Sequence, residues 1–173
     1  MSPSVAIVTG SSSGIGKATA IRLSRDFSAV VLAARGAAKL EEVKATKGAV
    51  VLIAGNTAEV PTASAAAAGV INAAIVALAK AFADRGLRDG VQVNSVSPGP
   101  VMTGRRLSMI EKWASAHKVN LDEAKQTLLT QAGISRYGEP QDIADLMAFL
   151  VSPAARWMTG IQLRIDGGEV KSI

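Results

Sequence analysis

Residues 9–17, TGSSSGIGK, combine three glycines with a run of hydroxyl side chains. An apolar run at 5–8 precedes them, and an amphipathic run at 17–27 follows. A strand, a tight glycine turn and a helix start place free backbone N–H groups and the positive end of a helix dipole at one point. Such an arrangement binds phosphate. The segment therefore predicts a phosphate-binding loop.

The spacing of the glycines distinguishes two kinds of phosphate loop. A nucleotide-triphosphatase loop needs four residues between its glycines and then Gly-Lys-Ser/Thr. Here five residues separate Gly10 from Gly16, and Ala18 follows Lys17, so no hydroxyl is available for Mg²⁺. The pattern Gly-x3-Gly-x-Gly is instead a dinucleotide-binding variant, in which Gly14 lets a pyrophosphate approach the backbone. A glycine- and serine-rich turn without a ligand remains the alternative.

The elements that position this loop alternate along the chain. Apolar, strand-like runs lie at 5–8, 29–34, 50–54, 91–96 and 161–165. Helical patterns lie at 17–27, 40–45 and 64–83, and two or three more helices are expected within 107–151. Strands that alternate with helices predict an α/β fold with a mostly parallel sheet.

The glycine pattern Thr9-Gly10-x3-Gly14-Ile15-Gly16 resembles the cofactor loop of the short-chain dehydrogenase/reductase family. Further matches follow in the family's order: Asn94, Pro98-Gly99, Thr103 and Asp166-Gly167-Gly168. The resemblance covers nearly the whole chain. It implies one dinucleotide-binding domain over residues 1–173, with a Rossmann-type doubly wound parallel sheet flanked by helices.

The resemblance also implies a nicotinamide dinucleotide as cofactor. In the family the Pro-Gly stretch lies against the nicotinamide, with Val101 and Thr103 as contacts for its carboxamide and phosphate. An acidic residue after the second strand would bind the 2′-OH of NAD, whereas Arg35 can pair with a 2′-phosphate. NADP(H) is therefore favoured over NAD(H). The expected cofactor-binding residues are Gly10, Ser12, Ser13, Gly14, Ile15, Gly16, Arg35, Asn72, Pro98, Gly99, Val101 and Thr103.

The chain departs from the family at the catalytic residues, which are a Ser and a Tyr-x3-Lys pair. Their positions fall on Gly55, Ala68 and Asn72, so no catalytic residue is assigned. The only tyrosine, Tyr137, lies far downstream. One hypothesis is an NADP-dependent oxidoreductase acting on a carbonyl or alcohol through a non-standard site, with water as the proton source. Its candidate polar residues are Asn56, Thr57, Thr62 and Ser64. The other hypothesis is a non-catalytic dinucleotide-binding protein, either a sensor or an inactive subunit. Asn72 could hold the nicotinamide ribose in both.

A second departure is length. The family has two further strands, with their helices, between the second strand and the run at 50–54. Here residues 40–47 lead almost directly into that run. The shortfall is on the order of 80 residues, or roughly two βα units absent near 44–48. Either the deletion is real, or the sequence as printed lacks a segment that the molecule contains. The well-kept core patterns on both flanks favour the second explanation.

Composition narrows the remaining function classes. The net charge is +5, but basic residues are scattered and only 3% of residues are aromatic, which disfavours nucleic-acid binding. The chain contains no cysteine and no secretory signal is visible, so a cytoplasmic location is expected and no metal site is assigned. The alanine-rich run at 63–79 is interpreted as a buried, closely packed helix rather than a membrane span. A homodimer or homotetramer is implied by the resemblance.

Overall fold

The computed structural model describes residues 5–9, 14–27, 29–33 and 48–171. The strands are β1 (Val5–Thr9), β2 (Ala29–Ala33), β3 (Gly48–Ile53), β4 (Val91–Pro98) and β5 (Gln162–Ile165). The helices are α1 (Gly14–Leu23), α2 (Ala66–Asp89), α3 (Gly104–His117), α4 (Leu121–Ala132) and α5 (Pro140–Leu150). Short 3-10 turns lie at Asn56–Ala58, Ala63–Ala65 and Pro153–Ala155. The expected helix at 40–45 lies outside the described residues.

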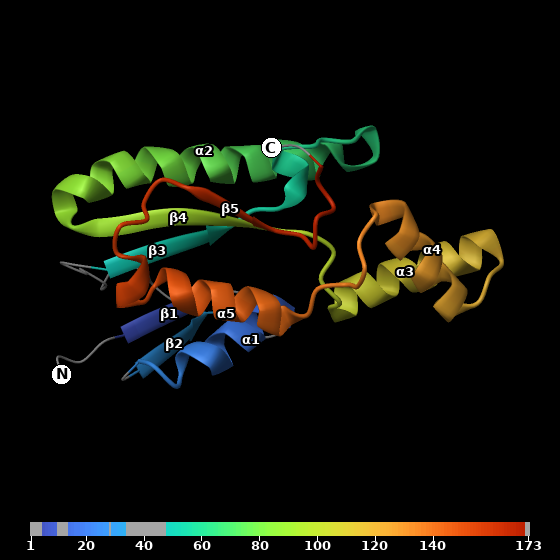
Figure 1. Cartoon of the computed structure of the whole chain (residues 1–173), viewed down its shortest axis with the longest axis horizontal. Coiled ribbons are helices and arrows are strands. Elements are labelled where there is room, and N and C mark those ends of the chain that lie inside the picture. Colours follow the sequence, from blue (N-terminus) through green and yellow to red (C-terminus); the bar gives the residue numbers. More distant parts are fainter. Residues whose placement is uncertain (1–4, 10–13, 28, 34–47, 172–173) are drawn as a thin grey trace.

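Every strand pairing in the described part of the chain is parallel, and helices flank the strands (Figure 1). The predicted α/β class of Rossmann type is confirmed. The strands form two separate sheets, one of β1 and β2 and one in the order β3-β4-β5. β1 and β3 are therefore not hydrogen-bonded to each other.

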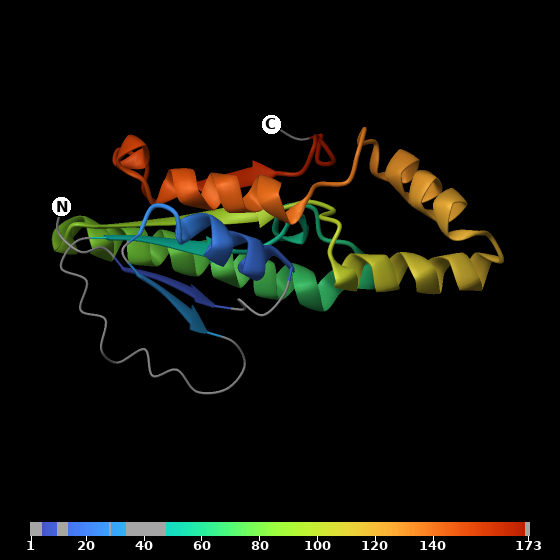
Figure 2. The ribbon, with the colours of Figure 1, turned by 90° about the horizontal axis from the view of Figure 1, so that it is seen from below.

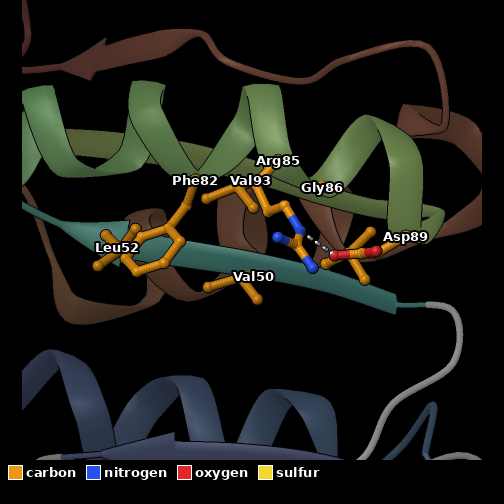
Figure 3. A pocket seen from close by; sticks show the side chains of 8 residues that line it. Val50, Leu52, Phe82, Arg85, Gly86, Asp89 and Val93 are labelled. Carbon is orange, nitrogen blue, oxygen red and sulfur yellow. Dashed lines mark hydrogen bonds and ion pairs between the residues drawn. The ribbon is translucent and has the colours of Figure 1, made fainter.

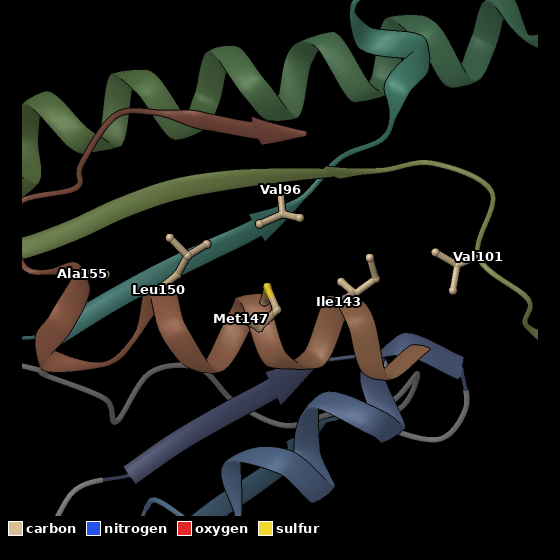
Figure 4. Close-up of a cluster of buried hydrophobic side chains, with 6 residues drawn as sticks. All are labelled: Val96, Val101, Ile143, Met147, Leu150 and Ala155. Carbon is tan, nitrogen blue, oxygen red and sulfur yellow. The ribbon is translucent and has the colours of Figure 1, made fainter. Parts of the chain in front are cut away.

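Helix α5 holds the two sheets together. One side of it buries Ile143, Met147 and Leu150 against Val96 of β4 (Figure 4). A second cluster joins Ala148 of α5 to buried residues of β1 and α1. A helix that presents small and apolar residues over a wide arc can pack on two neighbours at once. The helix begins as the sequence predicts, because Pro140 occupies its first turn.

The long helix α2 covers the other face of the β3-β4-β5 sheet along a narrow stripe of small residues. Only Gly69, Ala79, Ala83 and Gly86 are fully buried. A Cβ on Gly86 would lie 2.2 Å from the carbonyl oxygen of Val91, so only glycine permits this close approach. The outward side is apolar and exposed, with Val70 72% and Leu87 68% exposed.

This exposure contradicts the prediction that the alanine-rich run at 63–79 is a buried, closely packed helix. Burial depends on which elements lie on both sides of a helix, and in the described residues the sheet covers α2 from one side only. The segment Ala63–Asp89 is also the one helix among the described residues that is long and apolar enough to cross a membrane by length and composition.

Helices α3 and α4 project from the rest of the molecule (Figure 2). They pack on each other around Ile110, Ala114 and Ala124. Together with α5 they are the three helices found within the region where two or three were expected.

Candidate functional site

The carboxyl ends of β3, β4 and β5 meet at one edge of their sheet. Ala54 donates its N–H to the carbonyl of Val96 at 2.8 Å, and Gly99 donates to the carbonyl of Ile165 at 3.0 Å. In open parallel sheets, ligands bind outside these ends. The candidate site therefore lies at this edge, where the segments after β3, β4 and β5 meet the start of α1.

Two of the segments expected to hold a cofactor touch at Gly14 and Thr103. Gly14 has a φ of +55°, and a Cβ there would lie 3.3 Å from Cγ2 of Thr103. The hydroxyl of Thr103 faces the other way and accepts the backbone N–H of Arg106 at 3.3 Å, which caps α3. The start of α1 and the start of α3 are therefore neighbours.

The segment after β4 is fixed by backbone contacts. A Cβ on Gly99 would lie 2.7 Å from Cα of Asp166. The Pro98-Gly99 turn and the Asp166 turn are therefore so close that no side chain fits between them at position 99. Val101 is only 6% exposed and packs in the core against α5. Its neighbour Met102 donates its backbone N–H to the carbonyl of Gly138 at 2.7 Å. Only the backbone of Val101 can therefore face a ligand.

The remaining expected cofactor residues divide into two groups. Ile15 is half-buried and packs against the α5 cluster, and Gly16 lies in the first turn of α1. Outside the described residues lie Gly10, Ser12, Ser13 and Arg35.

The three positions that carry catalytic residues in the family are close together. Asn72 donates through Nδ2 to the hydroxyl of Thr57 at 2.8 Å. A Cβ on Gly55 would lie 2.8 Å from that same Nδ2. Ala68 lies one helical turn before Asn72 on α2 and is exposed. None of these three side chains can exchange a proton near neutral pH.

Asn56 makes contacts that sequence reasoning missed. Its Nδ2 donates to Oε2 of Glu169 at 2.8 Å and to Oδ2 of Asp166 at 3.3 Å. Its Oδ1 is buried without a hydrogen-bond partner among the described residues. These bonds attach the segment after β3 to the turn after β5, and they direct the Asn56 amide toward two carboxylates rather than toward Asn72.

The four polar residues suggested as substitutes for the family's catalytic set do not gather. Asn56 turns toward Asp166, Thr57 bonds Asn72, and the hydroxyls of Thr62 and Ser64 lie 3.3 Å apart. A hollow of about 450 Å³ lies between residues 57–63 and α2, and of these four it is lined only by Thr57 and Thr62.

Tyr137 does not replace the missing tyrosine. Its hydroxyl donates to the carbonyl of Lys125 at 3.0 Å, and its ring packs in the α3–α4 cluster. Burial raises the pKa of Tyr137, against a smaller opposing effect of Arg106 and Lys125. The described residues also contain no group of three or more His, Cys, Asp or Glu side chains that could hold a metal ion.

Comparison with known proteins identifies the family. A family model described as "Enoyl-(Acyl carrier protein) reductase" matches residues 24–169. Galactitol 2-dehydrogenase (L-tagatose-forming) of Cereibacter sphaeroides is 34% identical over 137 residues, which is 79% of this chain and 47% of that protein. NADPH-dependent reductase BacG of Bacillus subtilis is 29% identical over 126 residues, covering 73% of this chain and 49% of that protein. The chain thus spans about half the length of these relatives.

Solved structures agree on the fold. A short chain dehydrogenase family protein from Francisella tularensis superimposes with a TM-score of 0.87 at 19% identity, over 99% of this chain and 100% of that one. L-Sorbose reductase from Gluconobacter frateurii, complexed with NADPH and L-sorbose, gives a TM-score of 0.81 at 19% identity, over 100% of this chain and 98% of that one.

Proposed function

The chain belongs to the short-chain dehydrogenase/reductase family, and on that premise we propose that it binds a nicotinamide dinucleotide across the strand ends described above. The contact between Gly14 and Thr103 carries this proposal, because it joins the two segments that the family uses to hold the cofactor. The pyrophosphate would lie on the N–H groups at the start of α1, where the helix dipole favours negative charge.

The described residues fit such a ligand. Gly14 carries no side chain at the start of α1, and α1 has ten residues, so its dipole is well developed. Asn72 keeps Oδ1 as a hydrogen-bond acceptor for a ribose hydroxyl while Nδ2 stays bonded to Thr57. The Pro98-Gly99 turn presents backbone without side-chain bulk beside this edge of the sheet.

NADP(H) is the form that we propose over NAD(H). Arg35 follows β2 in the sequence, with no acidic residue between them, and a guanidinium there could pair with a 2′-phosphate. Two of the similar proteins point the same way, since BacG is named an NADPH-dependent reductase and the L-sorbose reductase structure contains NADPH.

The activity that we propose is hydride transfer with a carbonyl or alcohol substrate, the hydride being supplied or accepted by the nicotinamide when it is bound. Gly55, Ala68 and Asn72 can neither protonate the substrate oxygen nor lower the pKa of a group that does. Water would therefore deliver the proton, and turnover would lack the roughly 10²–10⁴-fold contribution of a positioned acid.

Gly55, Ala68 and Asn72 also favour a second, non-catalytic function. A chain that keeps the cofactor frame and has lost the proton-transfer groups can serve as a dinucleotide sensor or as an inactive subunit. The exposed apolar side of α2 supports association with a second copy, as a homodimer or within a homotetramer. A cytoplasmic location remains part of this proposal.

One pair of measurements separates the two functions. The purified chain is titrated with NADPH and with NADH while nicotinamide fluorescence is followed, and NADPH consumption is then measured with ketones, quinones and oxoacyl esters. Binding with consumption supports the oxidoreductase, whereas binding without consumption supports the non-catalytic protein. Absence of binding to both nucleotides contradicts both proposals.

A further inference from the structure

Glu59 connects the segment after β3 to β5 through two hydrogen bonds. Its Oε1 accepts Nε2 of Gln162 at 2.8 Å, and its Oε2 accepts Nη1 of Arg164 at 2.6 Å. Gln162 and Arg164 are two residues apart on β5, so their side chains leave the same face of the sheet. One carboxylate therefore holds the turn at Asn56–Ala58, which it directly follows, against that face.

The same contacts reach the strand that leads into the Pro98-Gly99 turn. Nε2 of Gln162 also donates to Oγ of Ser97 at 2.8 Å, and Ser97 is fully buried. Glu59 and Ser97 therefore accept hydrogen bonds from the same side-chain amide. Because Ser97 directly precedes Pro98-Gly99, this amide ties the segment after β3 to the end of β4.

Thr57, two residues before Glu59, contacts α2 instead. Its hydroxyl accepts Nδ2 of Asn72 at 2.8 Å. Among the residues that the structure describes, Asn72 is the only α2 side chain that hydrogen-bonds to another element. The position of the Asn72 amide therefore depends on where the turn at 56–58 is held.

The other end of α2 has no comparable polar anchor within the described part of the chain. There, Val50, Leu52 and Phe82 line a groove of about 330 Å³ between β3 and α2 (Figure 3). Arg85 and Asp89 beside this groove are paired with each other at 2.9 Å, within α2 itself. The bond from Asn72 is thus the polar contact that fixes α2 beside the proposed cofactor site.

We propose that Glu59 is a positioning residue of the cofactor site and acts on the nicotinamide half of the dinucleotide. This role rests on the proposed function, in which Asn72 accepts from a ribose hydroxyl and the Pro98-Gly99 turn lies beside the ligand. Glu59 acts on both through other residues. It sets the bond between Thr57 and Asn72 and, through Gln162, holds the end of β4.

A neutral side chain at position 59 would hold this turn less firmly. The hydrogen bond from the Arg164 guanidinium to a carboxylate is charge-assisted. The Glu59 and Arg164 side chains are 31% and 26% exposed, so water screens the pair only in part. Asn56 keeps its bond to Asp166 at 3.3 Å when Glu59 is removed. Loss of Glu59 should therefore shift the turn without detaching it.

The test separates the two halves of the dinucleotide. Calorimetry measures the binding of NADPH and of adenosine 2′,5′-bisphosphate, which has the 2′-phosphate but lacks the nicotinamide half. Glu59→Ala should weaken NADPH binding about fivefold or more, the size of one lost hydrogen bond, and should leave bisphosphate binding nearly unchanged. Glu59→Gln keeps an acceptor for Gln162 but loses the charge, so its NADPH affinity should lie between those of Glu59→Ala and the parent chain.

NMR of side-chain amides tests the geometry without a ligand. The Asn72 amide resonances should shift in Glu59→Ala, and they should shift in Thr57→Val, which removes the acceptor directly. Thr57→Val should also weaken NADPH binding selectively, and adding Glu59→Ala should cost less than the two single losses combined. Glu111→Ala, which removes an exposed carboxylate on α3, is the control and should change neither affinity nor the Asn72 resonances.

Each contrary result has its own meaning. Equal weakening of both ligands by Glu59→Ala would assign Glu59 a general structural role and overturn the proposal. Unchanged NADPH affinity, or an unshifted Asn72 amide, would show that Glu59 does not control that amide and would also overturn it. A parent chain that binds neither ligand would contradict the proposed function itself, and the positioning role with it, so the two failures are distinguished by the parent chain alone.

Discussion

Cα of Gly14 and the methyl group of Thr103 are neighbours, although 89 residues separate them in sequence. A Cβ on Gly14 would lie 3.3 Å from Cγ2 of Thr103, and the φ of Gly14 is +55°. This contact fixes the start of α1 against the start of α3. A methyl group added at Gly14 would therefore disturb both the backbone conformation there and the proposed cofactor site.

Gly14→Ala should weaken NADPH binding and destabilise the fold. A left-handed backbone costs a residue with a Cβ about 1–2 kcal/mol, and the methyl group also crowds Thr103. The loss of NADPH affinity should be about tenfold or more, which corresponds to ~1.4 kcal/mol. Fluorescence titration and urea unfolding measure the two effects. The control is Gly104→Ala, whose Cβ would have nothing within 4 Å and should leave both quantities nearly unchanged. Equal effects of the two substitutions would contradict the role of Gly14.

Asp142→Asn should destabilise the protein at neutral pH but not in strong acid. Hydrogen bonds from Arg136 at 2.8 and 3.0 Å, followed by that from the N–H of Glu139 at 2.7 Å, lower the pKa of Asp142. A carboxylate with a depressed pKa stabilises the fold above its unfolded pKa of about 3.9, and this contribution disappears as pH falls through the folded pKa.

The expected loss for Asp142→Asn at pH 7 is about 1 kcal/mol of unfolding free energy, because the pair is partly exposed to solvent. Urea unfolding at pH 7 and again well below pH 4 gives the comparison. Asp122→Asn is the control, since the Asp122 side chain is 91% exposed. A loss of the same size at both pH values would show that the charge of Asp142 is not responsible.

The sequence predicted those parts of the fold that local pattern determines. The apolar run at 91–96 became β4, and Pro140 starts α5 as expected. Contacts between distant residues could not be derived in this way. Asn56 and Asp166 are 110 residues apart, and no pattern in either segment indicates the other. The prediction that α2 is buried was wrong for a related reason. Burial depends on which distant segments cover each side of the helix, and the sequence of α2 alone does not show this.

The candidate site divides along the same line. The glycine pattern and the Pro98-Gly99 turn indicate candidate segments from sequence alone, since each requires a special backbone at a strand end. The pairing of Gly55 with Asn72 follows only from three-dimensional packing. The backbone requirement of a single segment can thus be read from the sequence, whereas the contacts between distant segments cannot.

Leu78→Glu should dissociate the proposed oligomer. Leu78 is 47% exposed on the apolar outer side of α2, where a buried carboxylate in an interface would be costly. Light scattering after gel filtration should show a dimer or tetramer for the parent chain and a smaller species for the variant. Met109→Glu, on α3 and 52% exposed, supplies the matched control. A monomeric parent chain at all concentrations would contradict self-association.

Arg35→Asp should reverse the nucleotide preference. The substitution removes the partner of a 2′-phosphate and supplies an acceptor for the 2′-OH of NAD. The ratio of the NADPH and NADH dissociation constants should shift at least tenfold toward NADH, about 1.4 kcal/mol. Arg25→Asp makes the same change of charge at an exposed position after α1 and should leave the ratio unaltered. A shift with both variants would indicate an effect of net charge alone.

Gly55 and Asn72 should behave as one unit in a double-mutant cycle. Gly55 has an extended backbone with φ −174°, so an alanine there is unstrained, and the three nearest atoms to its Cβ all belong to the Asn72 amide. Gly55→Ala should therefore displace the amide and break its hydrogen bond to Thr57, at a cost of about 1 kcal/mol. Asn72→Ala removes the same bond directly.

The double variant should consequently be little less stable than either single variant, with a coupling energy near 1 kcal/mol from urea unfolding. Additive losses would show that the two side chains act independently. A coupled result has a further consequence for catalysis. A serine at position 55 would require the Asn72 amide to move, because its Cβ would lie 2.8 Å from Nδ2 of Asn72.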